Sequence, residues 1–170
     1  LAALGWHRQD DTRVMVAPQC PSVAEPLTPG LVWQQLDAAS YAEVVGALRG
    51  SPAEQRSAHA QRLALSPVPY QGWVLRRPDD GQVLACGQSA AEGDLVGLYD
   101  VFTHPQARGQ GLARILCSRL LAQAHAAGAR VAYLQVDADN HPARAIYRRL
   151  GFADAYAYHY RSPDPGADPH

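Results

Sequence analysis

The sequence predicts an α+β domain in which helices flank a mixed central sheet, and three observations support this prediction. Short strand-like segments joined by tight turns run from about residue 73 to residue 103, which is typical of an antiparallel meander. A strand–turn–helix–strand unit follows over residues 95–136, and such units normally lie parallel with a right-handed crossover. With 170 residues, 47% of them hydrophobic, the chain can form one domain with a sizeable core.

The first 30 residues are expected to form a strand and a linker ahead of the main domain. The apolar segment 14–16 has strand character, and the proline-rich segment 21–30 indicates an extended loop. Residues 4–6 (Leu-Gly-Trp) precede this strand much as residues 150–152 (Leu-Gly-Phe) precede the last one. Either the likeness is chance, or residues 1–30 preserve the end of a preceding copy of the same domain.

The domain itself is expected over residues 31–161 and begins with two helices, near 41–49 and 52–65. Ser40 and Ser51 each precede a glutamate by three residues, which is the pattern of a reciprocal N-terminal cap. A proline also suits the first position of the second helix.

Three strands of the meander come next, at 73–77, 82–88 and 95–103. Pro78 to Gly81 separates the first two, because proline presets φ and glycine accepts a positive φ. Gly93-Asp94 marks the second turn.

The C-terminal half alternates between helix and strand. Apolar residues recur at helical spacing after residue 112, and a glycine stands just past the expected helix end. The elements expected here are a helix over 112–127, a strand over 131–136, a helix over 142–150 and a strand over 152–161, with a disordered tail over 162–170.

Composition and charge exclude several classes of function. A net charge of −1 argues against a nucleic-acid binder, and no apolar run approaches the roughly 20 residues that span a bilayer. The fifteen basic residues are all arginine, which excludes a Schiff-base lysine and suggests a GC-rich, bacterial genome. Three scattered cysteines match neither a disulfide framework nor a metal site, so the bacterial cytoplasm is the expected location.

A phosphate site is predicted where the third strand leads into the long helix. Gly109 and Gly111 allow close approach of a ligand to the backbone and leave the first amides of the helix unpaired. The alternative is a tight turn that binds nothing. Two other nucleotide motifs fail here, because Arg114 replaces the third glycine of a dinucleotide fingerprint and a Walker loop needs lysine.

Two motifs resemble those of the GNAT acetyltransferase superfamily. Arg108-Gly109-Gln110-Gly111-Leu112-Ala113 is similar to the family's pyrophosphate loop, Arg/Gln-x-x-Gly-x-Gly/Ala. The segment from Asn140 to Phe152 resembles its second signature, Asn-x-x-Ala-x-x-x-Tyr-x-x-x-Gly-Phe. The resemblance covers residues 70–161 well and implies a GNAT fold, in which the two central strands splay apart at a β-bulge.

The resemblance also implies a role for each matching residue. Acetyl-CoA is the expected cofactor, with the amide of Val101 facing the thioester oxygen and Tyr147 acting as general acid for the departing thiolate. The residues expected to bind the cofactor are Val101, Phe102, Thr103, Arg108, Gly109, Gln110, Gly111, Leu112, Ala113, Asn140, Ala143 and Tyr147.

Spacing supports the second motif independently of the resemblance. Asn140, Ala143 and Tyr147 are three and four residues apart, so they share one face of a helix. The alternatives are a helix N-cap for Asn140, which is compatible with ligand contact, and a packing role for Tyr147.

The group that accepts the amine proton is not fixed by the sequence. Some relatives use a glutamate in the strand before the asparagine, but Gln135 stands at that place here. Asp100, His104 and Asp137 are the candidates, of which Asp100 is preferred, and a water chain or a neutral amine is the alternative.

We therefore expect an N-acetyltransferase that acts by direct attack in a ternary complex. Its acceptor is predicted to be a primary amine of a small molecule or amino acid, with a protein N-terminus second and a non-catalytic acyl-CoA-binding module as the rival class. We expect no metal, nucleic-acid or membrane partner, and a monomer or homodimer. Several aromatic residues are expected either to line an acceptor pocket or to pack in the core. They are Trp33, Tyr41, Trp73, Tyr99, Tyr156, Tyr158 and Tyr160.

Overall fold

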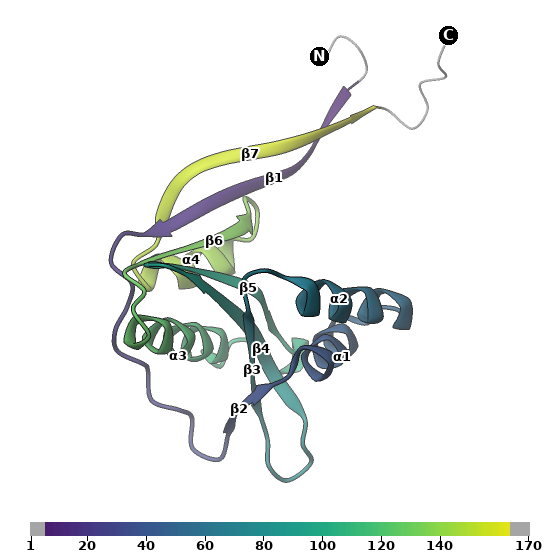
Figure 1. Cartoon of the computed structure of the whole chain (residues 1–170), viewed down its shortest axis with the longest axis vertical. Helices are drawn as coiled ribbons and strands as arrows, with labels where there is room; N and C mark the ends of the chain where they lie inside the picture. Colours follow the sequence, from purple (N-terminus) through teal and green to yellow (C-terminus); the bar gives the residue numbers. More distant parts are fainter. Residues whose placement is uncertain (1–5, 164–170) are drawn as a thin grey trace.

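The computed structural model describes residues 6–163, which form a seven-stranded mixed sheet with helices on both faces (Figure 1). The strands are β1 (Trp6–Ala17), β2 (Val32–Leu36), β3 (Tyr70–Arg76), β4 (Val83–Glu92), β5 (Leu95–Thr103), β6 (Val131–Asp137) and β7 (Ala153–Pro163). The helices are α1 (Ala38–Arg49), α2 (Ala53–Leu65), the 3-10 turn η2 (Pro105–Ala107), α3 (Leu112–Ala126) and α4 (His141–Arg149). None of the helices among these residues is long and apolar enough to cross a membrane.

The strand order is β2-β3-β4-β5-β6-β1-β7, and the α+β prediction is confirmed. Strands β2 to β5 pair antiparallel as a meander. Strands β5 and β6 pair parallel, and α3 connects them in the sequence. Strand β2 was not predicted, because its segment Val-Trp-Gln-Gln-Leu carries little alternation of apolar and polar residues.

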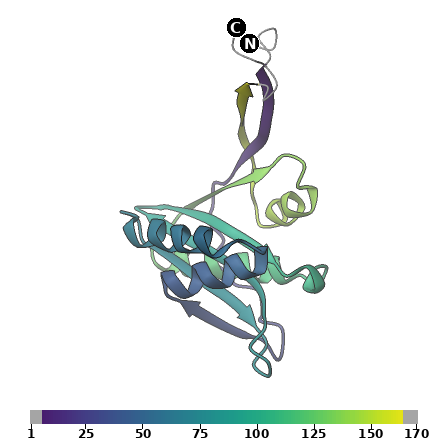
Figure 2. The ribbon, with the colours of Figure 1, turned by 90° about the vertical axis from the view of Figure 1, so that its right-hand side faces the viewer.

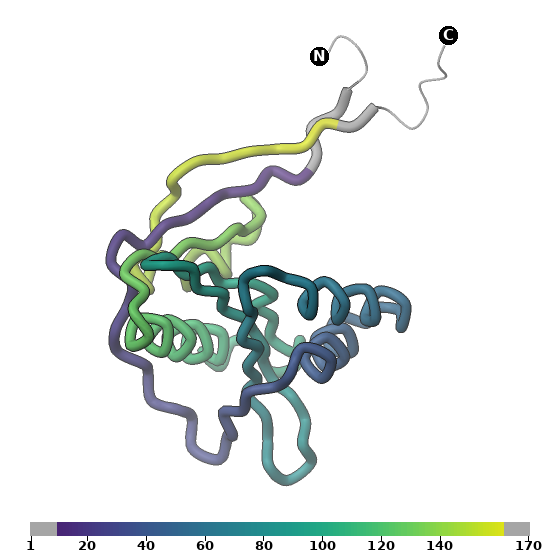
Figure 3. Tube along the Cα trace, in the orientation of Figure 1, coloured from purple at the N-terminus to yellow at the C-terminus, as the bar shows by residue number. Residues whose placement is uncertain are grey.

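Strand β1 is longer than the predicted segment 14–16 and lies inside the sheet, between β6 and β7. It pairs antiparallel with both, for example Met15 with Leu134 of β6. The following linker runs past α3 to the opposite edge of the sheet (Figure 3). Cys20 donates its amide hydrogen to the carbonyl of Arg130 at 2.7 Å, and Glu25 contacts α3. Residues 6–17 are thus a structural part of the domain rather than an appendage.

The paired strands β1 and β7 extend away from the body of the domain (Figure 2). Strand β7 continues to Pro163, so the prediction of disorder from residue 162 is wrong for its first two residues. The rest of that predicted tail lies outside the described residues.

The two predicted serine caps are also wrong. Helix α1 begins one turn early, because the Asp37 carboxylate accepts hydrogen bonds from the amide of Ser40 at 2.9 Å and from its hydroxyl at 2.8 Å. An aspartate satisfies both donors where a serine hydroxyl would satisfy one. Helix α2 has Pro52 at its N-cap position and no side-chain cap.

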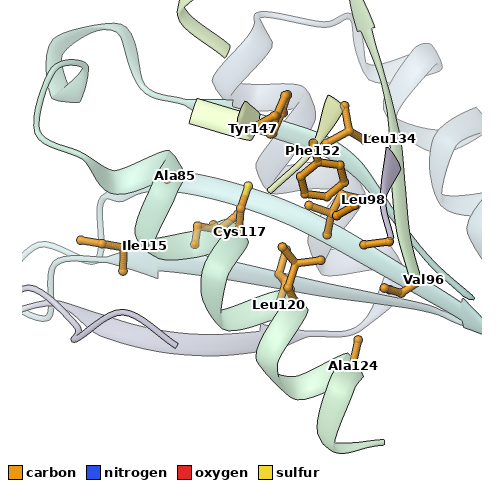
Figure 4. Packing of buried hydrophobic residues seen from close by; sticks show 14 of the residues in the cluster. Ala85, Val96, Leu98, Ile115, Cys117, Leu120, Ala124, Leu134, Tyr147 and Phe152 are labelled. Atoms are coloured by element: carbon orange, nitrogen blue, oxygen red, sulfur yellow. The ribbon is translucent and has the colours of Figure 1, made fainter. Parts of the chain in front are cut away.

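The core is divided between the two faces of the sheet. Helix α3 packs on one face through a row of buried side chains that includes Leu116, Cys117 and Leu120, close to Phe152 (Figure 4). Helix α1 covers the other face with Tyr41 and Val45. The two layers hold the central strands at fixed positions, and the candidate site lies where these strands separate.

Truncation of Leu116 to alanine should destabilise the domain strongly. Leu116 is fully buried (0% exposed), and leucine-to-alanine changes at such positions cost about 2–5 kcal/mol through lost transfer energy and a residual cavity. Urea unfolding followed by circular dichroism measures the free energy of unfolding. The matched variant Leu65→Ala removes an 83% exposed side chain and should cost less than about 0.5 kcal/mol. Equal costs would contradict this description of the core.

Candidate active site

A gap between the two central strands forms the floor of the candidate site. Strands β5 and β6 pair only between Leu95–Leu98 and Val131–Leu134, and beyond these residues they separate. Asp100 has a φ of 53°, and the pairing of β5 with β4 jumps from Tyr99–Gln88 to Phe102–Cys86. This register jump is a β-bulge that bends β5 away from β6. The predicted splay is confirmed, with the bulge on the β4 side of β5.

A cavity of about 840 Å³ occupies this gap and gathers nearly all of the predicted site residues. The predicted residues on its wall are Asp100, Val101, Phe102, Thr103, Arg108, Gly109, Gly111, Leu112, Ala113, Asn140, Ala143 and Tyr147. Gln110 was also predicted and is not on the wall. A cavity of this size suits a small molecule or cofactor.

The glycine loop has the geometry of a phosphate cradle. Gly109 and Gly111 adopt φ values of 78° and 75°, and Gly111 is the N-cap of α3, with no side chain to cap the helix. The first amides of α3 therefore point outward without intrahelical partners, at the positive end of the helix dipole. A Cβ on Gly109 would meet no atom within 4 Å, so space next to the loop is open for a ligand. The loop thus has the geometry to bind a phosphate or pyrophosphate group.

Helix α4 presents the second predicted group of residues to the same cavity. The Asn140 side chain accepts a hydrogen bond from the backbone amide of Ala143 at 3.2 Å, so Asn140 is the N-cap of α4. Asn140 thus takes the alternative role predicted for it, which is compatible with ligand contact. Its side-chain amide group stays available to a ligand. Tyr147 lines the cavity and is only 7% exposed, with its ring against Phe152.

Burial, and the nearby Cys117 to a smaller extent, raise the pKa of the Tyr147 hydroxyl far above its ordinary value. The hydroxyl is therefore protonated throughout the neutral and moderately alkaline range. The hydroxyl thus carries the proton that its predicted role as general acid requires, while the raised pKa also makes it a weaker acid than an exposed tyrosine.

Asp100 lies at the bulge and contacts residues from three elements. Its carboxylate accepts a hydrogen bond from the side-chain amide of Gln88 at 2.6 Å. It also lies 3.3 Å from Nη1 of Arg49 and 3.2 Å from Nε2 of His59. It is the candidate base that lies next to Val101.

Of the other two candidate bases, only Asp137 lines the cavity. His104 caps η2, since its Nδ1 accepts the amide hydrogen of Gln106, and it does not line the cavity. Asp137 lines the cavity at the end of β6. Gln135, which replaces the glutamate of some relatives, accepts a hydrogen bond from the Tyr158 hydroxyl at 2.7 Å.

The seven aromatic residues divide into three groups. Tyr99 and Tyr158 line the cavity, whereas Tyr156 and Tyr160 are each 62% exposed on β7. The three that belong to the packed interior are Tyr41, Trp33 and Trp73, the last two stacked with ring centroids 4.7 Å apart.

Sequence reasoning missed Arg49 and His59. Both reach Asp100 from the helices α1 and α2, more than 40 residues away along the chain. An arginine and a histidine on amphipathic helices are typical of solvated positions, so no local signal marks them.

The fold and the cavity define an α+β domain with a hollow between two parting strands and the N-terminus of a helix, a place that suits a phosphate-bearing ligand. A model of the acetyltransferase (GNAT) family matches residues 42–152, more than half of the sequence, and the chain belongs to this family.

Known proteins add to this assignment. An IAA acetyltransferase of Azospirillum brasilense is 35% identical over 94 residues, which are 54% of this chain and 60% of that protein. A tandem GNAT protein from the clavulanic acid biosynthesis pathway superposes with a TM-score of 0.78 at 18% identity, over 94% of this chain and 55% of that one. An aminoglycoside acetyltransferase from an uncultured soil metagenomic sample superposes with a TM-score of 0.60 at 20% identity, over 79% of this chain and 98% of that one. The two structural likenesses show the fold, and the chain spans 60% of the curated relative's length.

Proposed function

We propose that this domain transfers an acetyl group from acetyl-CoA to a primary amine of a small molecule or amino acid, by direct attack in a ternary complex. One observation carries the proposal. A single cavity brings together the glycine-led N-terminus of α3, the bulged strand at Val101 and the buried, protonated Tyr147. Separately each feature has a structural explanation, but together they supply a phosphate cradle, an oxyanion donor and an acid.

In this proposal, residues of the chain bind the coenzyme, polarise the thioester and transfer protons. Acetyl-CoA, when bound, supplies an activated acetyl thioester. The loop at Gly109 and Gly111 holds the pyrophosphate, and the backbone of Val101 to Thr103, unpaired with β6, holds the arm as an added strand would. The Val101 amide donates to the thioester oxygen as negative charge develops there.

Two proton transfers complete the reaction. A bond forms between the amine nitrogen and the acetyl carbon while the carbon–sulfur bond breaks. Tyr147 gives its proton to the departing sulfur, and the proton of the amine passes to Asp100, directly or through water. Asp100 lies next to Val101 in the chain, and its carboxylate has a lone pair beyond those that face Gln88, Arg49 and His59.

A covalent acyl-enzyme is disfavoured by the burial of the two thiols that lie near residues of the cavity wall, Cys86 beside Asp100 and Cys117 beside Tyr147. Cys117 is fully buried on α3, and burial raises the pKa of its thiol to about 12. A neutral, enclosed thiol is a poor nucleophile. Direct attack by the amine is the simpler route.

The test is release of free thiol from acetyl-CoA in the presence of a panel of primary amines. Acetylated product and thiol should appear in equal amounts with at least one small amine, and peptides with free N-termini form a second arm. Calorimetric binding of acetyl-CoA without turnover on any acceptor would instead support a non-catalytic module. The engagement of Asp100 by Arg49 is the observation that favours this rival.

A further inference from the structure

A second, smaller hollow of about 200 Å³ lies between α1 and α2 and borders the cavity at Arg49 and Asp100, which line both. The residues on its wall are Val45, Gly46, Arg49, Ser51, Gln55, Arg56, His59, Arg62 and Asp100. It lies on the side of the bulge opposite α3, where α1 and α2 cover the sheet (Figure 1). An acceptor could therefore approach the bulge from here while the coenzyme occupies the main cavity.

The hollow carries a surplus of positive charge. Arg49 lies 3.3 Å from Asp100, and Arg56 lies 3.1 Å from Glu43, so these two cations are balanced. The exposed side chain of Arg62 has no hydrogen bond or ion pair to any other residue that the structure describes. One positive charge is left over when His59 is neutral.

The local structure also fixes Arg56 in position. The Arg56 side chain lies across Gly46 of α1. A Cβ added to Gly46 would come within 2.3 Å of the Cγ and Cδ atoms of Arg56. Its Nη1 donates to the Ser51 carbonyl at 2.8 Å. Gly46 therefore makes room for the aliphatic part of the Arg56 side chain, and the Ser51 carbonyl and Glu43 hold its guanidinium at the wall of the hollow.

We propose that the acceptor is a small amine that also carries a carboxylate, which binds in this hollow against Arg62 and Arg56. The amine then lies toward Asp100 and His59, beside the Val101 amide. This inference rests on the proposed acetyltransferase function and adds the class of acceptor to it. Arginine suits the task, because its planar donors match the two oxygens of a carboxylate.

Charge and size together exclude other classes of acceptor. A polycationic amine would bring positive charge next to three arginines, and like charges in such a site disfavour binding. The aminoglycoside acetyltransferase with the same fold is therefore a poor guide to this chain's acceptor. The hollow is also smaller than typical ligand pockets, so it suits one charged group and a few carbon atoms.

The experiment compares α-amino acids with their primary carboxamides, which keep the amine and lose the negative charge. We expect kcat/KM for thiol release to be about tenfold higher or more for the acids, since a hydrogen-bonded charge pair is worth about one factor of ten. In Arg62→Gln this preference should shrink about tenfold, because kcat/KM falls much more for the acids than for the carboxamides. The control Arg77→Gln removes an exposed arginine paired with Asp80, outside both hollows, and should keep the preference.

The outcomes separate the two proposals. Equal use of acids and carboxamides by the wild-type protein would overturn the carboxylate site and leave the acetyltransferase function standing. The carboxylate site is overturned in the same way if Arg62→Gln and Arg77→Gln behave alike. Absence of thiol release with every amine, although acetyl-CoA binds, would overturn the proposed function and this inference with it.

Discussion

Replacing Gly111 with glutamate is expected to abolish acetyl-CoA binding, with a loss of affinity of about 100-fold or more, or about 2.7 kcal/mol. Gly111 has a φ of 75°, a conformation that costs a residue with a Cβ about 1–2 kcal/mol. The new carboxylate would also lie at the amides that we expect to hold the pyrophosphate, and would repel it. Isothermal titration calorimetry with acetyl-CoA measures the effect.

The matched control for this variant is Gly30→Glu. Gly30 has a similar φ of 81° and open space around its Cα, but it lies in the linker before β2. Both variants should show comparable thermal unfolding, and only Gly111→Glu should lose the coenzyme. Wild-type affinity in Gly111→Glu would place the nucleotide elsewhere and remove the basis of the proposed function.

Local features of the sequence were enough to predict much of the fold. Strand β5 was predicted at Leu95–Thr103, as found, because Gly93-Asp94 and Pro105 bound it on both sides. The end of α3 was predicted to within one residue because Gly128 follows it. In each case the deciding residue acts through its own backbone preferences, and such preferences do not depend on distant contacts.

Long-range pairing could not be predicted in the same way. Strand β1 joins the sheet between β6 and β7, whose residues follow it by more than 100 positions. An apolar segment such as 14–16 has the same pattern whichever strand it joins. Asp37 likewise displaced Ser40 as the cap of α1, because two acceptor oxygens compete better than one hydroxyl.

The same distinction between local and long-range features applies to the candidate site. The glycine loop and the Asn140 to Tyr147 face were predictable because each is built from residues close together in the chain. The surroundings of Asp100 were not, since Gln88, Arg49 and His59 reach it from three separate elements. The contacts of the proposed base are therefore the part of the site that needed the structure.

Replacing Tyr147 with phenylalanine should lower kcat by about 100-fold, within the range usual for loss of a general acid, and leave acetyl-CoA affinity within about twofold. The ring keeps its contact with Phe152, so the variant should fold, while the proton donor is lost. Because burial raises the pKa of this hydroxyl, the wild-type rate should not fall as pH rises through the ordinary tyrosine range near 10. Thiol release measured against pH, with calorimetry for binding, separates these effects.

Tyr156→Phe is the matched control, since it removes a hydroxyl from a 62% exposed tyrosine on β7 that does not line the cavity. Its turnover and coenzyme affinity should equal those of the wild type. If Tyr147→Phe also turns over normally, the hydroxyl does not deliver the proton, and water must protonate the sulfur. If affinity falls as much as kcat, Tyr147 holds the coenzyme in the ground state and does not act on the transition state alone.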